Sequence, residues 1–192
     1  MILEISFALW VLWLLYWLIS ARHRADGTGS AGVWREGAGS RLVHLSFMLA
    51  VAILLTRNDL PFGFLRLRVW PHALGLDLLG LALQFAGLGF TVWARQVLGK
   101  NWSARITTAD TQALIATGPY RRVRHPIYTG VLTALAGTAV MLGTVRGFAA
   151  VALATVAFSL KIRREEAALR GRFGDAYVAY AQAVPAVWPH LF

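Results

Sequence analysis

Runs of apolar residues divide the chain into alternating hydrophobic and polar stretches. The runs cover about residues 2–20, 42–55, 73–98, 127–145 and 148–160. A helix needs roughly 20 apolar residues to cross a bilayer, and several of these runs meet or approach that length. The pattern predicts an all-α, polytopic membrane protein with about five transmembrane helices.

The last two runs are predicted to form a helical hairpin, with Arg146 and Gly147 in the connection between its arms. The second arm is apolar over only roughly 20 Å at 1.5 Å per residue, short of a full crossing. We therefore expect it to leave the membrane as a charged helix that reaches Arg172. Gly174 should end this helix, and Asp175 is a plausible N-cap for a last short helix in a C-terminal tail.

Composition supports a membrane protein and removes several kinds of site. The chain is 57% hydrophobic and 15% charged, whereas soluble domains carry about 25% charged residues. There is no cysteine, which excludes disulfides, thiolate nucleophiles and cysteine metal sites. The net charge of +10 comes from basic residues that flank apolar runs, so membrane lipids are the expected partners and nucleic acid is not.

The basic residues are unevenly divided between the loops. Of 19 Lys and Arg residues, 15 lie in 21–41, in 95–126 or from 161 onward, and four lie in the remaining loops. The positive-inside rule then places the N-terminus outside and the C-terminus in the cytoplasm. Residues 99–126 would form a polar segment at the cytoplasmic face of this multi-pass protein. Gln84, near the middle of the third run, is predicted to make an interhelical hydrogen bond.

The densest polar chemistry lies in residues 114–130. Because the fourth and fifth runs form a hairpin, residues 120–128 should emerge from the membrane beside residues 161–166. Two clusters that are distant in sequence would thus meet at one membrane surface, where a site could form.

These clusters carry groups suited to binding a small polar ligand. Tyr120 and Tyr128 offer aromatic faces and hydroxyl groups, and His125 offers ring nitrogens. Arg124 and Lys161 offer positive charge for an anion. Glu165 and Glu166 offer negative charge for a cation. No H-E-x-x-H, G-x-S-x-G or P-loop motif is present, and no metal site is predicted.

A ligand with an amino acid end and a cationic centre would suit this mixture, and S-adenosylmethionine is such a ligand. The residues alone leave other readings open. The arginines could form a patch that binds phosphate, and Glu166 with Arg170 could be an ordinary i,i+4 pair on an exposed helix. A transporter fragment, an assembly factor and a lipid-anchored scaffold also fit.

Motifs over roughly residues 87–189 resemble the isoprenylcysteine carboxyl methyltransferase family of small integral-membrane methyltransferases. The run R-H-P-x-Y-x-G, followed about 35 residues later by E-E and then by F-G-x-x-Y, is the most specific. The motifs are Trp93-Ala94-Arg95, Leu98-Gly99-Lys100-Asn101-Trp102-Ser103, Gly118-Pro119-Tyr120, Arg124-His125-Pro126-Ile127-Tyr128-Thr129-Gly130, Glu165-Glu166, Phe173-Gly174-Asp175-Ala176-Tyr177 and Val184-Pro185. The resemblance divides the chain into residues 1–86, N-terminal helices without an assignable motif, and residues 87–192, a methyltransferase core in the same membrane unit.

The family resemblance implies a pocket for S-adenosylmethionine that is capped by the tail and open sideways to the membrane for a lipophilic acceptor. The family's basic residue that faces the substrate falls on Lys161, where eukaryotic members have arginine; lysine is a point charge rather than a bidentate fork. The positions that resemble the family's cofactor contacts are Gln112, Ala113, Leu114, Ile115, Tyr120, His125, Pro126, Ile127, Tyr128 and Glu165.

The expected activity is methyl transfer from S-adenosylmethionine to a lipophilic acceptor, in the first place O-methylation of an isoprenylcysteine-like carboxylate. Lys161 and Arg124 would orient the acceptor, and Glu165 would orient the cofactor. One alternative is N- or S-methylation of a phospholipid amine or a small thiol. Such an acceptor must lose a proton, so Glu165 or His125 would then be a candidate base. Another alternative is a non-enzymatic membrane protein that kept the fold.

Overall fold

The computed structural model describes residues 1–22, 38–57, 61–99 and 114–187. Within them the regular structure is helical, and the only β pairing is an isolated bridge between Arg68 and Thr144. The elements are α1 (Ile2–Arg22), α2 (Ala38–Thr56), η1 (Gly63–Arg66), α3 (Leu74–Leu98), η3 (Gly118–Arg121), α4 (Pro126–Leu142), α5 (Val145–Phe173) and α6 (Asp175–Ala183).

Three of the described helices are long and apolar enough to cross a membrane. They are Ile2–Ser20 within α1, Leu74–Leu98 and Val145–Phe173, and Pro126–Leu142 is a shorter apolar helix. The predicted all-α, polytopic membrane fold is confirmed. The long second arm of the hairpin is confirmed too, because α5 continues as one helix from the apolar run into the charged stretch.

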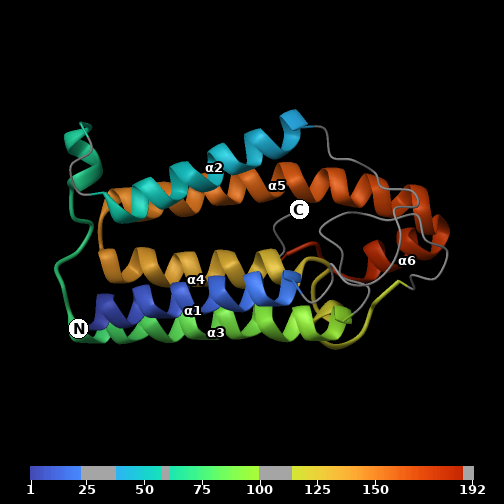
Figure 1. The fold of residues 1–192 in the computed structure, drawn as a ribbon, viewed down its shortest axis with the longest axis horizontal. Helices are drawn as coiled ribbons and strands as arrows, with labels where there is room; N and C mark the ends of the chain where they lie inside the picture. Colours follow the sequence, from blue (N-terminus) through green and yellow to red (C-terminus); the bar gives the residue numbers. More distant parts are fainter. Residues whose placement is uncertain (23–37, 58–60, 100–113, 188–192) are drawn as a thin grey trace.

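The long helices lie side by side in two groups (Figure 1). Helices α1, α3 and α4 form one group, and α2 lies along α5 in the other. The N-terminus and the connections on either side of η1 lie at one end of the bundle, together with the turn between α4 and α5. The C-terminal end of α3, η3, the start of α4 and α6 lie at the other end. The helix order therefore allows residues 120–128 and 161–166 to meet at this end of the bundle, as predicted.

Glycines allow α3 and α4 to approach backbone to backbone, as small residues do in membrane helix pairs. A Cβ added at Gly87 would lie 2.5 Å from the carbonyl oxygen of Gly130, and one added at Gly137 would lie 2.3 Å from that of Gly80. This contact holds α4, which carries the start of the candidate site, firmly against α3.

Hydrogen bonds attach α1 to this pair. Trp10 Nε1 donates to Thr138 Oγ1 at 3.1 Å, and Trp13 Nε1 donates to Thr91 Oγ1 at 2.6 Å. Gln84 Nε2 donates to the Ser6 carbonyl at 2.9 Å, which confirms the interhelical hydrogen bond predicted for this residue. The N-terminal helix thus packs directly on the helices that carry the family motifs.

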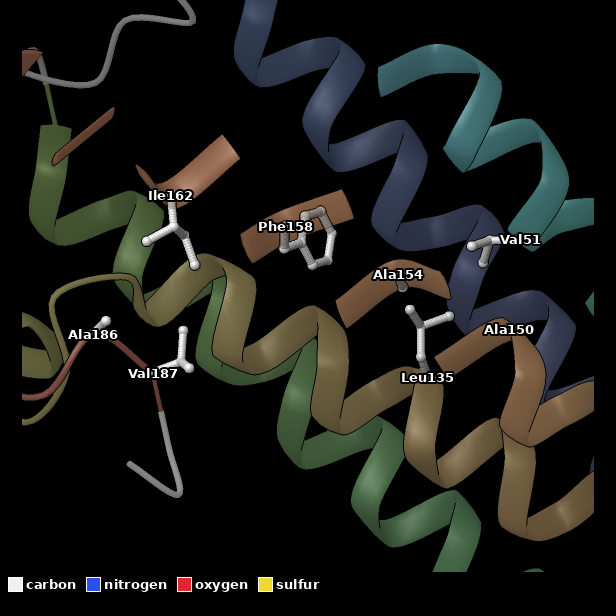
Figure 2. Close-up of a cluster of buried hydrophobic side chains, with 8 residues drawn as sticks. All are labelled: Val51, Leu135, Ala150, Ala154, Phe158, Ile162, Ala186 and Val187. Carbon is white, nitrogen blue, oxygen red and sulfur yellow. The ribbon is translucent and has the colours of Figure 1, made fainter. Parts of the chain in front are cut away.

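The described part of the C-terminal tail consists of residues 175–187. A cluster of buried apolar side chains joins it to the two groups of helices (Figure 2). It combines Phe158 and Ile162 of α5 with Leu135 of α4, and Ala186 and Val187 of the tail belong to the same cluster. Val187 is fully buried. The tail is therefore part of the packed core at the end of the bundle that carries α6.

The connection in the hairpin differs from the sequence prediction. Gly143, at φ +57°, ends α4 in the left-handed conformation, and α5 already begins at Val145. Arg146 and Gly147 therefore lie in the first turn of α5, and the prediction that they form the connection was wrong. The turn falls at Gly143 because glycine takes a positive φ without steric cost. Arg146 is instead buried, and its side chain donates to the carbonyls of Leu54, Leu55 and Arg57 near the end of α2.

The start of the last helix is displaced by one residue. Gly174, at φ +51°, both ends α5 and occupies the N-cap position of α6. Asp175, predicted as the N-cap, is the first helical residue. It still places a negative charge in the first turn, where the helix dipole favours it.

Candidate functional site

The site is built where the segment between α3 and α4 meets the far end of α5. Gly118, at φ +58°, opens η3, which presents Tyr120 in a buried position. Tyr180 of α6 donates its hydroxyl to the Tyr120 carbonyl at 2.6 Å. Burial raises the pKa of Tyr180 to about 12, so its hydroxyl keeps the proton that makes this bond. Helix α6 thereby fixes the turn that carries Tyr120.

Arg124 ties this turn to α5 and to the tail. Its Nε and Nη2 donate to Oε1 of Glu166 at 2.8 and 2.6 Å. Its Nη1 donates to the carbonyls of Ala181, at 2.9 Å, and Val184. The guanidinium is therefore engaged on all three nitrogens by groups of this chain.

The backbone of the same segment also pairs with the tail. Arg124 N donates to the Pro185 carbonyl and His125 N to the Ala186 carbonyl, both at 2.9 Å. Together with the side-chain bonds of Arg124, these contacts lay the tail along the start of α4. Among the described residues, the tail thus forms one side of the candidate site and is held there by hydrogen bonds.

His125 lies between two carboxylates. Its Nε2 is 3.3 Å from Oε1 of Glu166, and its Nδ1 is 3.6 Å from Oε2 of Glu165. The ring stacks on Tyr128, with centroids 5.8 Å apart and planes at 22°. His125 is buried, so its position is determined by these partners from α4 and α5.

Tyr128 and Glu165 form the direct link between α4 and α5. The Tyr128 hydroxyl donates to Oε1 of Glu165 at 2.6 Å, and its ring stacks on Phe158 with centroids 4.9 Å apart. Lys161 Nζ lies 5.9 Å from the centre of the Tyr128 ring. Lys161 and Glu165 are four residues apart on α5, so a cation and a carboxylate share one helix face beside an aromatic ring.

Exposure separates the two adjacent glutamates. The Glu165 side chain is 28% exposed, whereas that of Glu166 is 11% exposed. Among the described residues, Glu165 and the neighbouring Lys161 are therefore partly open, while Glu166 is enclosed by Arg124 and His125. The described residues contain no group of three or more His, Asp or Glu side chains that could hold a metal ion.

The remaining predicted residues have different positions. Leu114 and Ile115 are half-buried in the irregular stretch that leads into η3. Pro126 is buried at the first position of α4, and Ile127 follows it half-buried in the same turn. Gln112 and Ala113 lie outside the described residues.

Glu166 has a role that the sequence analysis did not predict. Its i,i+4 contact with Arg170 exists, at 3.5 Å, but the shorter bonds are those to Arg124. The sequence does contain a signal for this. Ala154, Phe158, Ile162 and Glu166 recur every four residues, and this spacing places all four on the buried face of α5.

Residues 79–171 match the sequence model of the isoprenylcysteine carboxyl methyltransferase (ICMT) family. Protein-S-isoprenylcysteine O-methyltransferase B of Arabidopsis thaliana is 39% identical over 90 residues, which are 45% of this chain and 45% of that protein. A probable protein-S-isoprenylcysteine O-methyltransferase of Oryza sativa subsp. indica is 41% identical over 95 residues, 45% of this chain and 46% of that protein.

A longer match links the chain to a bacterial protein with a different name. The cobalt-zinc-cadmium resistance protein CzcN of Cupriavidus metallidurans is 30% identical over 175 residues, 88% of this chain and 65% of that protein. The chain spans about half the length of the plant methyltransferases that it matches.

The helical membrane fold and the candidate site define a class of small polytopic proteins with a cluster of polar side chains at one end of the bundle, where α4 meets α5. Residues 79–171, just under half of the chain, belong by sequence to the isoprenylcysteine carboxyl methyltransferase family.

Proposed function

We propose that the chain is an integral-membrane methyltransferase that uses S-adenosylmethionine and methylates the carboxylate of a lipophilic, isoprenylcysteine-like acceptor. Family membership supports the reaction class. The observation that carries the proposal is the bond between Tyr128 and Glu165, with His125 and Lys161 beside it. It brings the two sequence clusters of the family motif into one site.

The chemistry of these side chains fits S-adenosylmethionine. Tyr128 stacks on His125 and on Phe158, and these rings would form an aromatic wall beside the Glu165 carboxylate. Glu165 offers carboxylate oxygens to an ammonium or to hydroxyl groups, and charged hydrogen bonds of this kind are the strong ones. The backbone from Leu114 to Thr117 lies in the irregular stretch just before η3 and could add peptide donors and acceptors.

In this reaction the main task of the protein residues is to position the two reactants. S-adenosylmethionine, when bound, supplies a methyl group that is already electrophilic. A carboxylate oxygen forms the new bond to this carbon as the carbon–sulfur bond breaks, and the electron pair stays on sulfur. No proton is transferred, so the residues need only align the two reactants and exclude water.

Lys161 is the proposed contact for the acceptor carboxylate. It is half-buried on the ligand-facing side of α5, one turn before Glu165. Arg124 was expected to share this task. Its bonds to Glu166, Ala181 and Val184 favour a different role. We propose that Arg124 holds the tail and the turn around Tyr120 in place.

Transfer of a labelled methyl group to a panel of acceptors tests this function. The panel contains a farnesylated cysteine with a free carboxylate, the same compound as its amide, an amino-phospholipid and a small thiol. The proposal expects label on the free carboxylate and none on the amide. Lys161→Gln should raise the KM for this acceptor, Lys161→Arg should keep it low, and Arg163→Gln, on the exposed side of the same helix, should change nothing.

Label on the amino-phospholipid or the thiol alone would replace the proposed acceptor but keep the enzyme class. Absence of transfer to every acceptor, with S-adenosylmethionine bound, would favour a protein that kept the fold without the reaction.

A further inference from the structure

The short segment 62–69 lies at the end of the bundle opposite the candidate site. It contains η1 and joins the region of α2 to α3, close to the turn between α4 and α5 (Figure 1). Nothing in the proposed function uses it. Its sequence alternates apolar and basic side chains, with Phe62 and Phe64 first, then Arg66, Leu67, Arg68 and Val69.

The backbone of this segment is held against the bundle. Val69 N donates to the Gly143 carbonyl at 2.8 Å, and Val145 N donates to the Leu67 carbonyl at 3.0 Å. Just after the segment, Trp70 Nε1 donates to the Val140 carbonyl at 3.1 Å. These bonds join the segment to the last turn of α4 and the first residue of α5. The segment therefore lies at the level along the bundle where α4 ends and α5 begins.

The side chains nevertheless point away from the bundle. Phe62 and Phe64 are each 59% exposed, Leu67 is 61% exposed and Val69 is 51% exposed. In the same stretch, Leu65 alone is buried. A backbone that is fixed in place by hydrogen bonds, with four large apolar side chains turned outward, presents a surface that suits an apolar environment rather than water.

The charged residues of the segment indicate whether this apolar environment is another protein or a lipid bilayer. Arg66 and Arg68 are exposed between the apolar side chains. Apolar and aromatic residues mixed with arginine are typical of the boundary between lipid acyl chains and headgroups, where guanidinium groups meet phosphates. A protein partner would need a surface on which apolar and anionic groups alternate in the same way. A phospholipid bilayer provides both acyl chains and phosphates at the level where α4 ends and α5 begins.

We propose that residues 62–69 lie in the membrane surface as an interfacial anchor, with Phe62, Phe64, Leu67 and Val69 among the acyl chains and Arg66 and Arg68 at the phosphates. This inference is independent of the proposed function.

The anchor has a consequence for the depth of the candidate site. It places Val145, the first residue of α5, at one boundary of the hydrocarbon core. A core of about 30 Å corresponds to roughly 20 residues of helix at 1.5 Å per residue. The opposite boundary then falls close to Glu165, and Lys161 lies just inside it. The anchor therefore sets the level at which the Lys161 and Glu165 face of α5 meets the membrane surface.

Spin labels test the anchor directly, because the chain has no cysteine of its own. Single cysteines replace Phe62, Phe64, Leu67 or Val69 in the full-length protein, reconstituted into vesicles of phosphatidylcholine and phosphatidylglycerol. The collision rates of each label with oxygen and with a water-soluble nickel complex report its depth. Phe85→Cys, on the outward face of α3 near its middle, is the lipid control. Arg170→Cys, exposed on the charged part of α5 beyond the boundary near Glu165, is the aqueous control.

The four labels are expected to show oxygen-to-nickel ratios several-fold above that at Arg170→Cys and below that at Phe85→Cys. Ratios equal to that at Arg170→Cys would overturn the proposal, because the segment would then lie in water. Low collision rates with both reagents would also overturn it, since another protein surface would cover the segment. Dipolar broadening at low protein-to-lipid ratio would identify that surface as a second copy of the chain. Four positions are used so that one misfolded variant does not decide the outcome.

Discussion

Glu165 and Glu166 are neighbours in sequence but face different partners. Successive helix residues point about 100° apart, so one turns toward Tyr128 and Lys161 and the other toward Arg124. Glu165 is partly exposed and can meet a ligand. Glu166 is enclosed and joins α5 to the turn and the tail. The same residue type thus has a proposed binding role at one position and a structural role at the next.

Replacing Glu166 by Gln should destabilise the fold, because it leaves the buried guanidinium of Arg124 without its counter-charge. Breaking a buried ion pair costs about 3–5 kcal/mol, and the free energy of unfolding in detergent micelles measures the loss. The control is Arg170→Gln, which removes only the longer, exposed contact to Glu166. Equal effects of the two substitutions would contradict the central position of Glu166.

At the scale of the elements, the packing of α3 on α4 depends on the absence of side chains. Gly87 faces the backbone of α4, whereas Gly89 faces open space two residues later. This pair separates contact effects from the general effect of glycine in a helix.

Gly87→Ala should lower the free energy of unfolding by about 1–3 kcal/mol, the usual cost of overpacking. The new Cβ would lie 2.5 Å from the Gly130 carbonyl oxygen, so one helix must move. Gly89→Ala should be neutral or slightly stabilising, because alanine favours the helix by about 0.5–1 kcal/mol. Equilibrium unfolding of both variants in the same detergent checks this. A loss at Gly89→Ala as large as that at Gly87→Ala would show that the close contact is not the cause.

The tail is the second element with a defined task. Removal of residues from 161 onward should abolish binding of S-adenosylmethionine while the earlier helices remain inserted. A shorter deletion, from Asp175 onward, tests the tail alone and should also weaken binding strongly. It removes the carbonyls that pair with Arg124 and His125 and the Tyr180 hydroxyl that fixes the turn. Binding of labelled S-adenosylmethionine is the measurement, and protease protection in vesicles verifies insertion. Wild-type binding by the shorter protein would contradict the role of the tail.

The sequence predicted some of these elements well and others poorly, for physical reasons. Apolar runs marked the long helices because a bilayer demands them, and the charged continuation of α5 followed from its short apolar part. The turn at Gly143 was missed because the hydrophobic pattern continues on both sides of it and the positive φ leaves no mark in the pattern. The tail's pairing with Arg124 and His125 joins residues about 60 positions apart, and local patterns carry no information about such contacts.

At the scale of the whole molecule, a different function is proposed for each end of the bundle. One end carries the site, built from α4, α5 and the tail. The other carries the segment 62–69, the turn at Gly143 and the N-terminus (Figure 1). The candidate residues at the first end were found in sequence because the hairpin brings them together. The assignment of that end to the cytoplasm remains a prediction from the loop charges.

The central claim is that Tyr128 and Glu165 belong to a binding site for S-adenosylmethionine. The most direct measurement is calorimetric titration of S-adenosylmethionine into the reconstituted wild-type protein, Glu165→Gln and Arg163→Gln. A hydrogen bond to a charged group contributes about 1.5–3 kcal/mol, so Glu165→Gln should weaken binding by about 10- to 100-fold. Arg163→Gln should bind like the wild type. Absence of binding to the wild type, or equal affinity in all three proteins, would contradict the account.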